Sequence, residues 1–400
     1  MSDRLPRTPP LEVVVAGGGV AALELVLALN DLAGDRVAVS LMAPEVDFTY
    51  RPPSTAAPFS LGYVERYPLA RLADDLGARL IPEGLAGVSA ERNEITTTSG
   101  ARVPNDRLVL AVGARPFPAF RHAITVGEED TTDALNGLIS DLELGAIHRV
   151  AFVVPSGASW TLPLYELAIM TARHGWRLGI DAARYWFVTP EPQPLAIFGA
   201  AVSPAVHAML EPEGITFIGS ASPDVQERAV LLDRRRERIE VDRIVCLPLL
   251  DGPGTPGVPT DADGFIPVDA NGQVPGMPNV YAVGDATTFP IKQGGLACQQ
   301  ADAVAELISA AAGAPLEPTP FRPVLRGKLI TGGRDRFLRS GVAGEPGAGE
   351  VSELPLWWPP TKIAGRYLSS YLLDRDEVDL REATGSVPHV AVEVSLDGIL

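Results

Sequence analysis

A glycine-rich stretch near the N-terminus constrains the fold of this chain more than any other feature. Residues 11–23 read LEVVVAGGGVAAL, so an apolar strand-like run leads into glycines and then into a helix-forming run. Gly17 permits a tight turn, Gly19 lets the backbone approach a pyrophosphate, and the small Ala22 lets the helix pack on the strand. Free N–H groups at a helix start bind phosphate. The sequence therefore predicts a dinucleotide site, or alternatively a tight turn that binds nothing. The expected contacts are Gly17, Gly18, Gly19, Val20, Ala21 and Ala22.

Two later segments carry motifs that accompany this one in flavoproteins. Residues 106–114 read DRLVLAVGA, and residues 279–285 read NVYAVGD. Together with the first motif they resemble the two-dinucleotide-domain flavoprotein superfamily, which includes the pyridine nucleotide-disulfide reductases. The resemblance implies that the dinucleotide is FAD and that Asp285 binds a ribityl hydroxyl, since a carboxylate accepts strong hydrogen bonds from a polyol. The contacts it implies here are Ala111, Gly113, Gly284 and Asp285.

Two further residues are candidates for the first domain's cofactor site. An acid that binds the ribose is expected after the second strand, which we assign to residues 36–42. Ala43 stands at that place, so Glu45 becomes the candidate. Residues 50–54 read YRPPS and resemble the YxRPP segment of ferredoxin reductase-like flavoproteins, which implies that Arg51 lies along the cofactor. The alternative for Arg51 is a proline-stiffened surface loop.

Composition limits the class of protein. A chain of 400 residues suggests two or three domains, and no stretch approaches the ~18 unbroken apolar residues that span a bilayer. The net charge of -17 argues against nucleic acid and against anionic membrane surfaces. Two cysteines far apart argue against a disulfide framework and favour a cytoplasmic setting. Five histidines without a close pair predict that there is no metal site.

The alternation of strand-like and helix-like segments predicts an α/β fold with two Rossmann-like domains, the second inserted into the first. We assign residues 1–117 and 243–316 to the FAD domain, 118–242 to the second nucleotide domain, and 317–400 to a C-terminal α+β interface domain. Trp357 and Trp358 lie in the last of these. They either wall a flavin or acceptor pocket or pack at a domain or subunit interface, the latter consistent with a homodimer.

The second domain departs from the pattern of an NAD(P)H site. Residues 155–160 read PSGASW in place of a glycine fingerprint, which leaves Ser156 and Gly157 as candidate phosphate contacts. Glu166 either lies near the nicotinamide, as the resemblance implies, or is a residue of the first helical turn. Glu191 would bind a ribose diol and repel a 2′-phosphate. The sequence therefore predicts weak use of NADH at best, with NADH favoured over NADPH.

A lysine lies close after the third motif. Residues 289–297 read FPIKQGGLA and resemble the lysine-x-glycine turn of sulfide:quinone oxidoreductase-like and flavocytochrome c sulfide dehydrogenase-like proteins, and less closely that of type II NADH dehydrogenases. The resemblance implies that Gln293 and Gly294 approach the flavin and that Lys292 balances the negative charge of the reduced ring. A surface lysine at a helix start is the alternative.

The cysteines do not form a redox motif. No CxxC or CxxxxC occurs, which excludes dithiol–disulfide chemistry, and Cys246 is expected to be a buried core thiol. The sequence thus predicts an FAD-dependent oxidoreductase that passes electrons from NAD(P)H through flavin to a small molecule or a small redox protein. Two alternatives stay open: a sulfide:quinone oxidoreductase-like enzyme that does not use nicotinamide, and a non-catalytic FAD-binding interaction protein.

Overall fold

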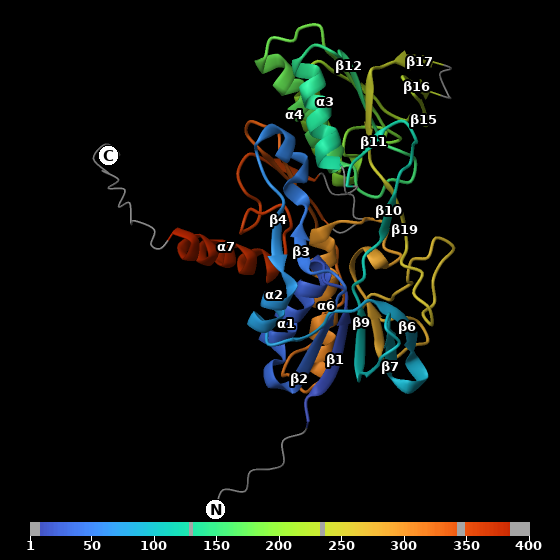
Figure 1. Cartoon of the computed structure of the whole chain (residues 1–400), viewed down its shortest axis with the longest axis vertical. Coiled ribbons are helices and arrows are strands. Elements are labelled where there is room, and N and C mark those ends of the chain that lie inside the picture. The colour runs from blue at the N-terminus through green and yellow to red at the C-terminus, as the bar shows by residue number, and fades with distance from the viewer. Residues whose placement is uncertain (1–8, 128–130, 233–236, 342–348, 385–400) are drawn as a thin grey trace, which may run out of the picture.

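The computed structural model describes residues 9–127, 131–232, 237–341 and 349–384. Two five-stranded parallel sheets lie at opposite ends of the elongated molecule, the first around β1 and β2 and the second around β11 and β12 (Figure 1). Each has helices on one face and a small antiparallel sheet near the other. The predicted α/β class with two Rossmann-like sheets is therefore confirmed.

The first sheet builds the site, because its strand ends carry the three motifs. In sheet order its strands are β20 (Val280–Ala282), β9 (Arg107–Leu110), β1 (Leu11–Ala16), β2 (Val37–Met42) and β5 (Arg79–Ile81). Strand β1 lies in the middle, so its side chains are buried on both faces, as its continuous apolar run requires. Val13 and Val15 pack against helices α1 (Val20–Leu32) and α6 (Gly294–Ala311). Val14 packs towards the small sheet of β6 (Leu85–Ser89), β7 (Glu94–Thr97) and β8 (Arg102–Pro104).

The second sheet has the order β11 (Ile124–Thr125), β18 (Arg243–Cys246), β12 (Arg149–Val153), β13 (Arg184–Val188) and β14 (Ile215–Ile218). One face packs on α3 (Thr131–Glu143), α4 (Leu162–Arg177) and α5 (Val202–Leu210). The other is covered by β15 (Pro223–Gln226), β16 (Ala229–Leu232) and β17 (Glu237–Glu240).

One predicted boundary differs from the structure. We assigned the chain from residue 243 onward to the FAD domain, but β18 pairs with β12 in the second sheet, with Val150 opposite Arg243. The apolar residues of β18 suit a buried central strand of either sheet, so composition alone could not assign it. The chain crosses between the two sheets in an antiparallel ribbon of β10 (Arg115–Phe117) and β19 (Leu249–Asp251).

The C-terminal part joins both sheets. Its strands β21 (Leu325–Leu329), β22 (Arg336–Ser340) and β23 (Glu350–Ser352) form an antiparallel sheet, and α7 (Leu368–Thr384) follows. Strand β21 packs so closely on α4 that a Cβ atom on Gly327 would lie 2.6 Å from Leu162 Cδ1. The predicted interface domain, residues 317–400, also includes residues 342–348 and 385–400, which lie outside the described residues.

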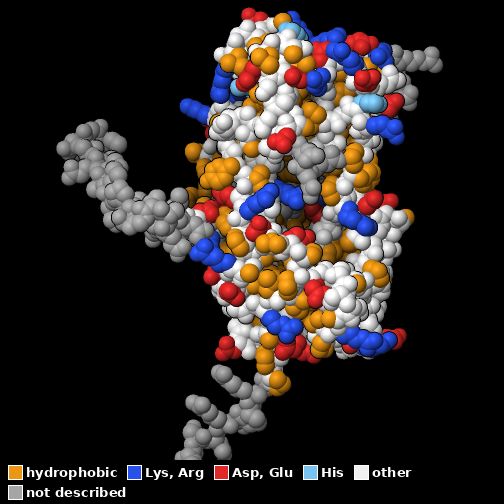
Figure 2. All heavy atoms as spheres, in the orientation of Figure 1, with side chains coloured by type: hydrophobic (Ala, Val, Ile, Leu, Met, Phe, Trp, Pro, Cys, Tyr) orange, Lys and Arg blue, Asp and Glu red, His pale blue; other side chains and the backbone are white. Residues whose placement is uncertain are grey.

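Short elements complete the fold. They are β3 (Asp47–Tyr50), β4 (Glu65–Pro68), α2 (Leu69–Asp75) and the 3-10 turns η1 (Gly34–Arg36), η2 (Pro52–Thr55), η3 (Ala57–Phe59), η4 (Ala90–Arg92), η5 (Ala196–Phe198) and η7 (Gly284–Ala286). Along the described chain, every helix is too short or too polar to cross a bilayer. Figure 2 shows acidic and basic side chains interspersed with apolar ones on the face in view.

Candidate functional site

The three sequence motifs meet at a cavity of about 820 Å³. They meet because β1, β9 and β20 are neighbours in a parallel sheet, so their carboxyl ends reach the same edge. The predicted residues that line the cavity are Gly17, Gly18, Gly19, Val20, Ala21, Glu45, Arg51, Ala111, Gly113, Gly284, Asp285, Lys292, Gln293 and Gly294. Ala22 does not line the cavity: it is fully buried on the side of α1 that packs against the sheet, which is the packing role expected of its small side chain.

The glycines after β1 form a cradle that fits a pyrophosphate. Gly17 has a φ of +122°, and a Cβ atom on it would lie 2.2 Å from the carbonyl oxygen of Ala111. Gly19 differs, because a Cβ atom there would meet nothing within 4 Å. Helix α1 begins directly after Gly19 and no side chain caps its first N–H groups. These donors therefore remain available to an anion.

Asp285 and Lys292 lie together in the wall of the cavity. The half-buried carboxyl of Asp285 receives no hydrogen bond from the described residues, and burial raises its pKa to about 6 although Lys292 opposes this. Burial lowers the pKa of Lys292 to about 8. The ammonium group of Lys292 donates to the carbonyl oxygen of Thr287 and lies 3.9 Å from the centre of the Phe265 ring. An acceptor without a donor suits a polyol ligand beside Asp285.

Two glutamines fix the backbone beside the cavity, one at the start of α6 and one at the turn of Gly284. The Gln293 side chain accepts a hydrogen bond from the Leu296 N–H (2.9 Å) and donates to the carbonyl oxygen of Arg326 (3.1 Å). Gln300 Oε1 accepts from the Gly284 N–H at 2.6 Å and so orients the turn that carries Asp285. Sequence reasoning missed Gln300, because a polar residue within a helix gives no signal of its buried partner.

A family model described as pyridine nucleotide-disulphide oxidoreductase matches residues 11–311. The chain belongs to this family. Its members are FAD-dependent oxidoreductases, and the glycine cradle, the uncapped start of α1 and Asp285 fit that cofactor. Membership of an enzyme family also argues against the alternative of a non-catalytic FAD-binding protein.

Several relatives of this oxidoreductase are known. Sulfide-quinone reductase of Aquifex aeolicus (strain VF5) is 26% identical over 305 residues, which are 70% of this chain and 69% of that protein. A structure of the sulfide:quinone oxidoreductase of Aquifex aeolicus has a TM-score of 0.78 at 20% identity and covers 95% of this chain and 93% of its own. A structure of NDH2 from Plasmodium falciparum has a TM-score of 0.64 at 12% identity and covers 93% and 94%. At these identities the structural likeness shows the shared fold.

The cysteines of this family member lie apart. Cys246 is in β18 of the second sheet and Cys298 is in α6 under the first, and both are completely buried and outside any disulfide. Neither lines the cavity. Burial raises the pKa of the Cys298 thiol, and the carboxyl groups of Glu24 and Asp302 raise it further. Cys298 is therefore held as an unreactive thiol.

The second domain does not assemble its predicted nucleotide contacts at the cavity. Ser156 and Gly157 lie exposed in the loop after β12 and outside the cavity lining. The Glu191 carboxylate is engaged by hydroxyl groups of Tyr165 (2.8 Å), Thr161 (3.2 Å) and Thr189 (3.2 Å). The same loop instead brings Trp160, Leu162 and Pro163, at the start of α4, into the cavity wall.

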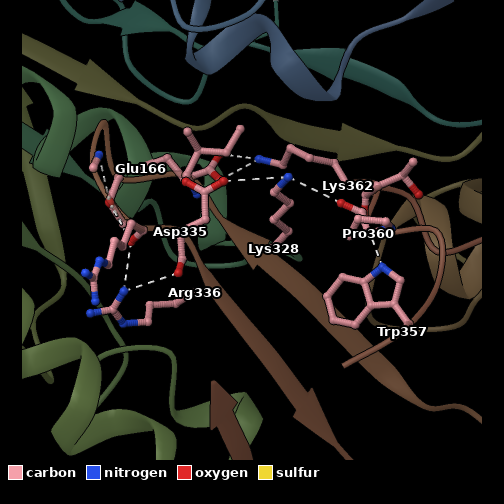
Figure 3. A network of polar contacts seen from close by, with 12 residues as sticks. Glu166, Lys328, Asp335, Arg336, Trp357, Pro360 and Lys362 are labelled. Carbon is pink, nitrogen blue, oxygen red and sulfur yellow. Dashed lines mark hydrogen bonds and ion pairs between the residues drawn. The ribbon is translucent and has the colours of Figure 1, made fainter. Parts of the chain in front are cut away.

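Glu166 is the centre of a buried polar network (Figure 3). Its carboxylate accepts hydrogen bonds from Thr55 Oγ1 (2.9 Å), from the Ile330 N–H (2.7 Å) and from Lys362 Nζ (2.5 Å). Burial raises the pKa of Glu166, and the charge of Lys362 opposes this. Lys362 lines the cavity, whereas Glu166 lies behind it. Sequence reasoning singled out Glu166 but missed Lys362, which lies 196 positions away in no recognisable motif.

A second cavity of about 330 Å³ adjoins the first. Both are lined by Lys328, Lys362 and Ile363. The exposed apolar side chains of Leu61, Tyr63 and Leu373 also line the second cavity. The two cavities therefore share a wall at Lys328, Lys362 and Ile363, the junction of the cavities, and the smaller one has apolar side chains beside that wall.

The tryptophans are not in the lining of either cavity. Trp357 donates its indole N–H to the carbonyl oxygen of Thr361 (3.1 Å) and packs edge-on against Phe337. Trp358 is 85% exposed. Of the two predicted roles, packing thus describes Trp357, and it fixes the turn that leads to Lys362.

Proposed function

We propose that this oxidoreductase passes electrons from its flavin to a quinone-type acceptor that enters through the second cavity, without a cysteine intermediate. The observation that carries the proposal is the junction of the two cavities at Lys328, Lys362 and Ile363. The apolar side chains along the second cavity suit a hydrophobic acceptor. The name of the curated relative, a sulfide-quinone reductase, supports the same class.

The chain's own residues supply binding, orientation and a proton. FAD, when bound, provides the two-electron redox chemistry. The cradle of Gly17 and Gly19 and the start of α1 hold the pyrophosphate, and Asp285 holds a ribityl hydroxyl. Lys292 and the start of α6 place positive charge in the same wall of the cavity as Asp285.

A quinone that takes up two electrons also takes up two protons. Lys362 Nζ can donate one of them, because this residue, like Lys328, lines both cavities and its side chain is 12% exposed. The second proton, and the one that restores the lysine, come from solvent at the exposed rim of the second cavity. Glu166 holds this ammonium group in place by accepting its hydrogen bond. Thr55 in turn orients Glu166.

A second candidate function is direct reduction of the flavin by NADH. It is supported by the second Rossmann-like sheet and by α4, whose first residues line the main cavity. Pro163 has no N–H for a phosphate, and the Glu191 carboxylate is engaged by hydroxyl groups. We therefore expect weak use of NADH, and the expected preference over NADPH loses its basis in Glu191.

The acceptor is tested by stopped-flow reoxidation. The FAD-loaded protein is photoreduced without oxygen and mixed with a concentration series of a short-chain ubiquinone analogue. We expect saturation, and we expect Leu61→Glu to raise the half-saturating concentration about tenfold or more, because an apolar ligand in the second cavity would have to desolvate the new charge in its wall. Leu144→Glu, an equally charged change of an exposed leucine at the end of α3, is the control. Reoxidation that does not saturate, or that both variants change alike, would contradict the proposal.

The donor is tested in the opposite half-reaction. Oxidised protein is mixed anaerobically with NADH, NADPH and sulfide in separate series. We expect NADH to reduce the flavin slowly and only at high concentration, because the protein lacks the glycine-rich loop that would bind the phosphates of NADH. Fast saturation at low NADH concentration would instead establish the second candidate function.

A further inference from the structure

Glu24 is a buried acid that the sequence motifs did not single out. It lies in α1, is completely buried, and its carboxylate accepts three backbone hydrogen bonds from a segment more than 340 residues later. The donors are the N–H groups of Arg366 (2.6 Å), Tyr367 (2.9 Å) and Leu368 (2.6 Å). Since α7 begins at Leu368, the carboxylate of one helix holds the start of another.

Asp302 of α6 lies beside this carboxylate, and its buried Oδ1 has no hydrogen-bond partner among the described residues. Two buried carboxyl groups placed in this way avoid repulsion when one carries a proton and shares it with the other. Burial raises the pKa of Asp302 to about 8, and the charges of Glu24 and Glu306 raise it while that of Arg366 lowers it. The proton therefore belongs to the pair at neutral pH. The other titratable groups around the pair are Cys298 on α6, Tyr367 before α7 and Asp31 on α1.

The segment held in this way carries part of the candidate site. Gly365 packs closely against α1 and α6: a Cβ atom on it would lie 2.8 Å from Glu24 Oε2 and 3.0 Å from Cys298 Sγ. Ser369 ties the start of α7 back to the carbonyl oxygen of Ile363 at 2.7 Å. Ile363 and the preceding Lys362 line both cavities. A change at Glu24 is thus transmitted to the junction of the cavities through a few bonded residues.

We propose that Glu24 is a positioning residue for the acceptor site: with Asp302 it holds the segment of residues 362–368 against α1 and releases it when the shared proton is lost. The second carboxylate charge then repels the first in a buried place, which weakens the hold on the three N–H groups. The effect on the acceptor rests on the proposed function, whereas the effect on the segment does not.

Hydrogen–deuterium exchange of the FAD-loaded protein tests the hold directly. Protection of the amides in residues 363–372, corrected for the intrinsic rate, is compared at pH 6.5 and pH 9.5. We expect it to fall roughly tenfold per pH unit above about 8, the slope for one proton. Asp302→Asn should keep its protection at both pH values, because the amide donates to Glu24 without titrating. Asp31→Asn, which removes the surface charge that accepts the Tyr367 hydroxyl, is the control and should follow the unaltered protein.

Two results would overturn the proposal: protection in the unaltered protein that does not change with pH, or the same fall in Asp302→Asn. Glu24→Gln should lose protection already at pH 6.5, and if it fails to fold, Asp302→Asn still carries the test. Reoxidation by the quinone analogue is measured in parallel, and its half-saturating concentration should rise with pH in the unaltered protein alone. If no quinone reoxidises the flavin, the proposed function fails while the exchange result stands.

Discussion

The carboxylate of Glu166 in α4 lies 2.5 Å from the Lys362 ammonium nitrogen, so a buried ion pair joins the second Rossmann-like domain to the segment before α7. The two partners are unequal, because Glu166 is completely buried and Lys362 reaches both cavities. Loss of one partner therefore has a different effect from loss of the other.

Replacing Lys362 by Met should destabilise the protein by about 3–5 kcal/mol, since it leaves a buried carboxylate unpaired. Glu166→Gln should be milder, because the Lys362 ammonium group can turn towards solvent in the cavities. The double variant should recover most of the loss. Without the lysine the pKa of Glu166 rises further, so the loss in Lys362→Met should grow with pH. Urea unfolding at pH 5.5 and pH 8 measures both effects; equal losses in the two single variants would contradict the expectation.

Gly17 and Gly19, two positions apart, should separate an effect on folding from an effect on cofactor binding. Gly17→Ala should cost about 3 kcal/mol or more in the apoprotein, because the new Cβ atom would lie 2.2 Å from the Ala111 carbonyl oxygen. Gly19→Ala meets nothing within 4 Å, so the apoprotein should stay within about 0.5 kcal/mol while its FAD affinity falls. Thermal unfolding of the apoprotein and FAD titration distinguish the two; unaltered FAD affinity in Gly19→Ala would refute the pyrophosphate assignment.

Asp285 should make FAD binding depend on pH. The ionised carboxylate accepts a hydrogen bond from a hydroxyl group more strongly than the neutral acid does, so FAD affinity should fall as the pH drops below about 6. Asp285→Asn should lower affinity roughly ten- to hundred-fold and remove the pH dependence. The stability of the apoprotein should depend on pH in the opposite direction from FAD affinity. Because burial raises the pKa of Asp285, this residue stabilises the fold least above about pH 6. Asp285→Asn should therefore be more stable than the unaltered apoprotein at pH 7.5. Affinity that stays pH-dependent in Asp285→Asn would point to another group.

Joint replacement of Cys246 and Cys298 by alanine should leave flavin reduction and reoxidation nearly unchanged. Both thiols are completely buried and neither lines a cavity, so the cost should be about 1–2 kcal/mol of stability from lost packing. The measurement is turnover of FAD-loaded protein with thermal unfolding alongside. Folded, FAD-loaded protein without turnover would show that a cysteine takes part in the chemistry.

The sequence predicted the first sheet and its cavity well because that information is local. The glycines after β1, the run before Gly113 and the turn at Gly284 can each be recognised from a few neighbouring residues, because glycine permits the backbone conformation needed there. The class of fold followed from the order of those motifs. Even the absence of a redox disulfide could be predicted from cysteine spacing.

The other half of the site could not be predicted, because it depends on contacts between residues that lie far apart in the sequence. Lys362 comes two positions after a pair of prolines and matches no motif, and only the folded chain shows that it meets Glu166. Glu24 reads as one more helix-former in α1, although it holds the start of α7. Glu191 has the expected place after its strand, but Tyr165 and two threonines engage its carboxylate. The strand β18 was assigned to the wrong sheet for a similar reason, since its apolar pattern does not indicate which strand it pairs with.

Both buried glutamates accept hydrogen bonds from one late stretch of chain, residues 362–368. During synthesis the two sheets are complete long before that stretch leaves the ribosome, and domains fold as they emerge. Until then Glu24 and Glu166 lie in nascent domains without their main donors, and each must stay hydrated or carry a proton. A chain interrupted before residue 362 would keep two such acids in its interior, so a stretch made late in synthesis supplies the donors that stabilise two domains made earlier.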